Sequence, residues 1–127
     1  MVKRLEVLAK EDDGFLRIVL HGDFASDLPD AVDDLARIIA LRRSTPHTRF
    51  LVDARAVEAR MSIPTTFEFA TLAYSEEPET GRVAGLDRPE HLVQGRFFEN
   101  LLQSRGRIYR LFTNEAEAVE WLLSENT

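Results

Sequence analysis

The feature that most constrains the fold is an alternation of short apolar runs with amphipathic helical patterns. Strand-like runs occupy residues 48–53, 82–85 and 108–112, and helical patterns lie between and after them. Strands that alternate with helices form a mostly parallel sheet with right-handed crossovers. The chain has 127 residues, the length of one ordinary domain, so we expect residues 1–127 to share one core.

The first twenty residues predict a β-hairpin. Leu5, Val7 and Ala9 alternate with Glu6 and Lys10, although Leu8 breaks the strict alternation, and residues 15–20 are almost entirely apolar. The turn between these runs ends in Gly14, which is suited to a positive φ. The hairpin therefore supplies the first two strands of the sheet.

The first helical pattern follows the hairpin. Ser26 or Asp27 can cap it, and arginines lie near its end, where the helix dipole favours positive charge. The spacing predicts one apolar face, formed by Leu28, Val32, Leu35 and Ile39.

The second helical pattern begins at Ser62, a suitable N-cap, with Pro64 in its first turn. The spacing places four side chains on one face, Ile63, Phe67, Ala70 and Tyr74. We expect residues 75–81 to form a loop, because they are polar and include a proline and a glycine.

Two further helices complete the pattern. Asp87 and Glu90 resemble a capping box that starts the third helix, and Gly106 follows its end. Asn114 is placed to cap the fourth helix. Gly95 lies inside the third helix, where we expect close packing against the sheet. The predicted fold is α/β, with the order β-β-α-β-α-β-α-β-α and a mixed, mostly parallel sheet of five strands.

Catalytic, cofactor and metal motifs are missing from the sequence. The chain has no cysteine, and its three histidines lie far apart without the spacing of a metal site. It contains no glycine-rich phosphate-binding motif and no nucleophile elbow. We therefore expect a binding protein without a cofactor or metal, not an enzyme. His21 and Asp23 remain candidate site residues, because ligands often bind where strands of an α/β sheet end.

Charge and hydropathy limit the partners. The net charge is −6, and no basic stripe is present, so we do not expect nucleic-acid binding. No apolar run approaches the roughly 20 residues that cross a bilayer. The N-terminus lacks the apolar core of a signal peptide, and we expect a cytoplasmic protein.

Aromatic residues leave two interpretations open. Phe67 and Phe69 lie about 200° apart on a helix, so they cannot share a face. The ring that lies off the core face either packs on another element or is exposed for a ligand or a second protein. The same argument applies to Phe97 and Phe98.

Three stretches resemble the STAS superfamily, and specifically its SpoIIAA-like branch. They are residues 49–53 (RFLVD), residues 82–84 (RVA) and residues 107–122, in which a strand ending in Phe112 leads to a capped helix ending in Trp121-Leu122. The resemblance implies a non-enzymatic regulator that binds a kinase-like protein. It also implies a switch by phosphorylation of a serine at a helix start, which falls near Ser62. Residues 60–64 (RMSIP) lack the aspartate, second serine and glycine of that pattern.

These observations favour a STAS-like regulatory module that acts through protein–protein interaction, self-association included. The candidate interaction or switch surface comprises Ser62, Ile63, Phe67, His21 and Asp23. The alternative is a domain that binds a small apolar ligand or lipid in a cavity between the sheet and the aromatic-bearing helices.

Overall fold

The computed structural model describes residues 4–24, 28–76 and 81–124. The side chains of Leu28 and of residues 72–76 are outside this description, as are the predicted cap residues Ser26 and Asp27. The elements in chain order are β1 (Glu6–Glu11), β2 (Leu16–Gly22), α1 (Leu28–Arg43), β3 (Arg49–Val57), α2 (Ile63–Glu76), β4 (Arg82–Leu86), the 3₁₀ helix η1 (Pro89–His91), α3 (Leu92–Ser104), β5 (Tyr109–Phe112) and α4 (Glu115–Leu123).

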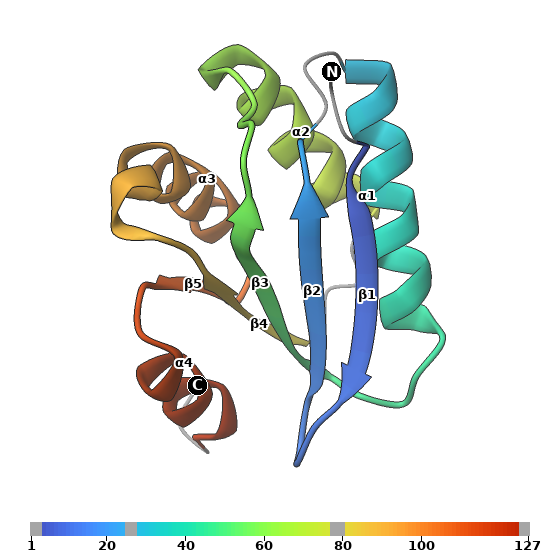
Figure 1. Ribbon diagram of the computed structural model, residues 1–127, viewed down its shortest axis with the longest axis vertical. Coiled ribbons are helices and arrows are strands. Elements are labelled where there is room, and N and C mark those ends of the chain that lie inside the picture. The colour runs from blue at the N-terminus through green and yellow to red at the C-terminus, as the bar shows by residue number, and fades with distance from the viewer. Residues whose placement is uncertain (1–3, 25–27, 77–80, 125–127) are drawn as a thin grey trace.

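The five described strands form one sheet in the order β1-β2-β3-β4-β5 (Figure 1). β1 pairs antiparallel with β2, and the other neighbours pair in parallel. Gly14 in the hairpin turn has a φ of 91°, as its position predicted. The predicted fold class and element order are confirmed.

The helices divide between the two faces of the sheet. Because each parallel strand lies beside the one before it, right-handed crossovers place α1, α2 and α3 on the same face. α1 packs against α2, and α2 packs against α3. α4 follows the last strand and packs on the opposite face, against β3, β4 and β5 (Figure 1).

Each face has its own core. Between the sheet and α1–α3 the buried residues include Leu35, Ile39, Phe69 and Leu102. Beneath α4 they are Phe15, Leu51, Ala84, Leu86, Phe112, Ala118 and Leu122. Burying a large apolar side chain stabilises the fold by about 1.5–3 kcal/mol, so both layers are needed to hold the sheet.

Two details of the predicted helices were wrong. On α1, Leu35 and Ile39 are buried, but the third member of that face is Ala31, and Val32 is 40% exposed. The stripe at positions 31, 35 and 39 repeats every four residues, so Val32 lies beside it. α2 continues to Glu76, so residues 75 and 76 belong to the helix and not to a loop.

The ends of α3 show one correct and one incorrect prediction. Gly106 has a φ of 81°, its N–H bonds the carbonyl of Gln103, and the N–H of Arg107 bonds that of Leu102. These bonds form a Schellman motif, which a glycine favours. The capping box was wrong, because η1 intervenes and the cap residue Arg88 makes no side-chain cap bond.

Two glycines, one in β4 and one in α3, permit close packing against side chains of β5. A Cβ at Gly95 would lie 2.7 Å from Leu111, which confirms the expected close packing against the sheet. A Cβ at Gly85 would lie 2.2 Å from the hydroxyl oxygen of Tyr109. The Tyr109 ring therefore lies across β4 only because residue 85 has no side chain.

Candidate functional site

The loop between β3 and α2 is held against the end of β2. The N–H of Glu58 donates to the carbonyl of Gly22 at 2.9 Å, and the N–H of Phe24 donates to the carbonyl of Ala59 at 3.0 Å. The Asp23 carboxylate accepts the N–H of Ala59 at 3.0 Å. Asp23 therefore fixes the backbone that leads into α2.

Ser62 caps the N-terminus of α2. Its hydroxyl oxygen accepts the N–H of Thr65 at 3.2 Å, and its carbonyl accepts the hydroxyl of Thr66 at 2.8 Å. Such a side-chain bond satisfies one of the amides that lack a partner in the first turn. Ser62 is itself exposed, so the cap leaves its hydroxyl within reach of another molecule.

Two apolar side chains follow Ser62 on the outer side of α2. Ile63 is 45% exposed and Phe67 is 46% exposed, and they lie one helical turn apart. We call Ile63 and Phe67 the α2 ridge. The buried face is formed instead by Thr66, Phe69 and Ala70. Phe67 and Phe69 thus point different ways, as the spacing predicted, and Ile63 and Phe67 do not share the buried face with Ala70.

His21 does not join the α2 ridge. It is exposed and pairs with Ala56 of β3. Because side chains alternate along a strand, His21 lies on the same face as Arg17, which contacts Glu115 of α4. The structure therefore brings Asp23 near the start of α2 and places His21 on the opposite face of the sheet.

An ion pair joins the loop between β3 and α2 to the residue that follows β4. Arg60 donates to both oxygens of Asp87, at 2.7 and 2.9 Å, and also to the carbonyls of Ala54 and Val57. Both side chains are nearly buried, at 12% and 9% exposure. This pair was not expected, because its members are 27 residues apart and Asp87 has the local sequence of a helix cap.

A cavity of about 190 Å³ lies between the sheet and α1–α3. Its lining is mostly apolar and includes Leu20, Leu35, Val52, Phe69, Phe98 and Tyr109. Burial raises the pKa of the Tyr109 hydroxyl above its ordinary value. The Thr66 hydroxyl, which accepts a bond from Gln94, is a second polar group in the lining.

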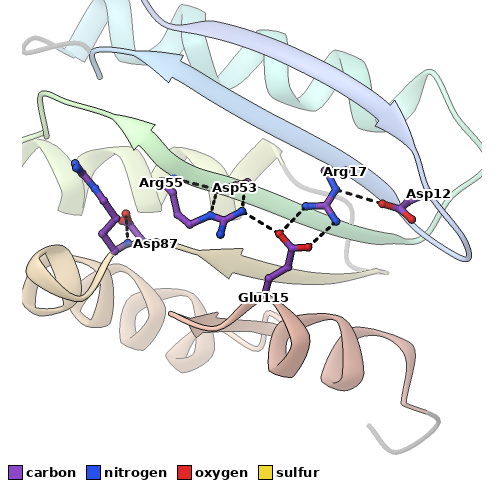
Figure 2. A network of polar contacts seen from close by, with 7 residues as sticks. Asp12, Arg17, Asp53, Arg55, Asp87 and Glu115 are labelled. Carbon is purple, nitrogen blue, oxygen red and sulfur yellow. Dashed lines mark hydrogen bonds and ion pairs between the residues drawn. The ribbon is translucent and has the colours of Figure 1, made fainter.

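On the other face an ion network joins α4 to the hairpin and β3, as Figure 2 shows. Glu115 accepts bonds from Arg17 at 3.2 and 3.4 Å and from Arg55 at 2.9 Å. Arg55 also donates to both oxygens of Asp53. Burial opposes ionisation of Asp53, but the bonds from Arg55 outweigh it and hold the pKa of Asp53 below its ordinary 3.8.

No three histidine, aspartate or glutamate side chains gather as metal ligands within the described ranges. Over the same part of the chain, no helix combines the length and the apolar character that a membrane crossing requires.

The chain matches no protein-family model and no curated protein sequence. Its structure is similar to an anti-sigma factor antagonist from Mycobacterium paratuberculosis, with a TM-score of 0.67 and 12% identity over 94% of this chain and 95% of that chain. It is also similar to an uncharacterized protein with a SpoIIAA-like fold from Shewanella loihica PV-4. That match has a TM-score of 0.59 and 18% identity over 93% of each chain. The chain therefore has a SpoIIAA-like fold, as the resemblance of its sequence implied.

Proposed function

We propose that the chain is a non-enzymatic regulatory module that binds a partner protein through the α2 ridge. The observation that carries this proposal is the exposure of Ile63 and Phe67, two large apolar side chains on adjacent turns. Exposed aromatic and aliphatic side chains that stand together are typical of protein interaction sites.

The contacts that hold the start of α2 support the same function. Asp23 holds the loop before α2, and Ser62 caps the helix, so the apolar pair stands on a fixed backbone. A surface that is ordered before binding loses less conformational entropy on association. The structural neighbour described as an anti-sigma factor antagonist suggests that the partner is a regulatory protein.

Ser62 gives the ridge a means of control. Its exposed hydroxyl lies at the N-terminus of α2, where the helix dipole stabilises an added phosphate. A phosphate at this position would place negative charge next to Ile63 and oppose the docking of an apolar surface.

In vivo photo-crosslinking tests the proposal. A photoreactive phenylalanine at position 67, introduced into the full chain in its native cell, should give a discrete adduct with one protein. The same group at Glu120, exposed on α4, serves as the control and should not give that adduct. Adding Ile63→Asn or Ser62→Glu to the position-67 protein should weaken the adduct. An adduct that is equally strong from both positions, or unaffected by either substitution, would remove the ridge from the function.

The cavity favours a second candidate function, the binding of a small apolar molecule with one hydrogen-bonding group. At about 190 Å³ it exceeds an engineered cavity of about 150 Å³ that binds benzene. Tyr109 lines the cavity, and its hydroxyl is the group that we expect to bond a hydroxyl or carbonyl on such a ligand.

Native mass spectrometry and phenol binding test this second function. A co-purifying small molecule, or saturable phenol binding in ligand-observed NMR, is expected. Val83→Ile narrows the cavity and should weaken binding, whereas Val19→Ile, on the opposite face, should not. A clean apo spectrum together with no phenol binding would argue against the cavity as a ligand site.

A further inference from the structure

β1 is one of the two edge strands of the sheet, and its side chains are mostly exposed. It pairs with β2 on one side, and Val7 is its only side chain that is even partly buried. An exposed edge strand presents unpaired N–H and C=O groups and is a template for another strand.

The hairpin hydrogen bonds determine which backbone groups of β1 are free. The N–H of Asp12 donates to the carbonyl of Phe15 at 3.1 Å. Hydrogen-bonded and non-bonded pairs alternate along an antiparallel ladder, so Lys10 and Leu8 are the residues that bond to β2. Val7 and Ala9 therefore direct their N–H and C=O groups to the outer edge.

In this segment, charged residues at equal distances before and after Leu8 have opposite signs. Glu6 and Lys10 lie two residues before and after Leu8, and Arg4 and Asp12 lie four residues before and after it. An antiparallel copy of the segment, centred on Leu8, would therefore face Glu6 with Lys10, whereas Arg4 and Asp12 already pair within the chain with Asp33 and Arg17. Opposite charges directly across a strand pair are stabilising, and a parallel in-register copy would instead face like with like.

We propose that a second copy of this chain pairs through β1, antiparallel and centred on Leu8, so that one sheet continues across a two-fold axis. Val7 and Ala9 of each copy exchange backbone hydrogen bonds, and Leu8 meets its counterpart in a non-hydrogen-bonded pair. Leu8 is 51% exposed in the single chain, so the pairing covers an apolar side chain that the fold itself leaves open.

The α1 side of β1 also fits this partner. Val7 points to that side and lines a shallow groove with Arg37, Ala40 and Leu41 of α1 and with Ser44, which follows the helix. In a two-fold arrangement the α1 helix of the second copy approaches the same groove. The α2 ridge lies on another helix, so the dimer does not depend on the proposed function.

A cysteine at position 8, where the proposed two-fold axis passes, gives a direct test. The chain has no cysteine, so Leu8→Cys introduces the only thiol. A non-hydrogen-bonded antiparallel pair has Cα atoms about 4.5 Å apart, which is within disulfide range. We expect Leu8→Cys to form a disulfide-linked dimer under mild oxidation. Val93→Cys, on a side chain that is 86% exposed on α3, is the control and should remain largely unlinked. Equal crosslinking of the two variants would contradict the pairing.

A charge swap tests the register, with the mass in solution measured by analytical ultracentrifugation. Glu6→Lys or Lys10→Glu should each convert the dimer to monomer, and the double variant should restore the dimer. Ala9→Pro removes an outward N–H without breaking the β1–β2 ladder, so it should give a folded monomer by circular dichroism. A wild-type protein that is monomeric at high micromolar concentration, or a dimer that survives Ala9→Pro, would overturn the proposal.

Discussion

At the scale of single residues, the most consequential contacts are those that no local pattern reveals. The Arg60 guanidinium satisfies two carbonyls of β3 and pairs with Asp87 after β4. Contacts between residues that are close in sequence were easier to predict. The helix caps formed by Ser62 and Asn114 are examples, because each side chain bonds an amide three residues further along the chain. The Arg60–Asp87 pair depends on strand positions that only the folded sheet brings together.

Removing one member of this pair should be costly. Asp87→Ala leaves the Arg60 charge nearly buried without its counter-ion, so we expect a loss of about 3 kcal/mol in the free energy of unfolding, measured with urea. Glu90→Ala removes an exposed carboxylate that contacts Arg88 at 3.8 Å, and should change the same quantity by less than about 1 kcal/mol. Equal effects would show that the buried pair does not stabilise the fold.

Gly106 tests a purely backbone effect. No atom lies within 4 Å of a Cβ built at this position, so only its φ of 81° opposes a larger residue. Gly106→Ala should lower the melting temperature and cost about 1 kcal/mol. Gly106→Asn should cost less, because asparagine adopts this conformation more readily. If the alanine variant is as stable as the wild type, the Schellman motif does not contribute as described.

At the scale of elements, α4 is attached to the sheet at both ends by arginines. Arg17 and Arg55 bind Glu115 in its first turn. At the other end Arg82 donates to the carbonyls of Trp121 and Ser124, at 2.8 and 2.9 Å. The sequence predicted α4 and its cap, because both follow from spacing. It did not predict these attachments, since each arginine lies on a strand distant in sequence.

The attachment at the first turn of α4, which includes Asp53, should make the free energy of unfolding depend on pH. The pKa of Asp53 is lowered in the folded protein, so its ionised form stabilises the fold above the unfolded value near 3.8. This contribution is lost as the pH falls through the lower folded pKa. Denaturant unfolding at a series of pH values should therefore show a flatter decline below pH 3.8 for Asp53→Asn than for the wild type. Parallel declines would mean that Asp53 does not contribute to acid unfolding.

At the scale of the whole molecule, three helices cover one face of the sheet and α4 covers part of the other. The element order could be predicted because alternating patterns and right-handed crossovers leave few arrangements. The cavity could not be predicted, because it arises where residues of the sheet and of α1–α3 meet without filling the space between them. Composition fixes how much apolar surface a chain can bury, but not where packing is incomplete.

Trp121 allows cooperativity across these layers to be measured. It is the only tryptophan, and it packs on α4 against Phe112, with Arg82 over its ring at 5.1 Å. Because both cores pack on the same sheet, unfolding followed by tryptophan fluorescence and by far-ultraviolet circular dichroism should have the same midpoint. Arg82→Met should lower both midpoints together. A fluorescence transition that precedes the loss of helix signal would show that α4 detaches as a separate unit.

The contact between Gly85 and Tyr109 has a consequence for how this sequence can diverge. The tyrosine ring occupies the volume that a side chain at position 85 would fill, so position 85 cannot gain a side chain without displacing Tyr109. Related sequences should therefore substitute the two positions as a pair, with a smaller residue at 109 wherever 85 is no longer glycine. Such covariation would also reshape the cavity, because Gly85 and Tyr109 both line it.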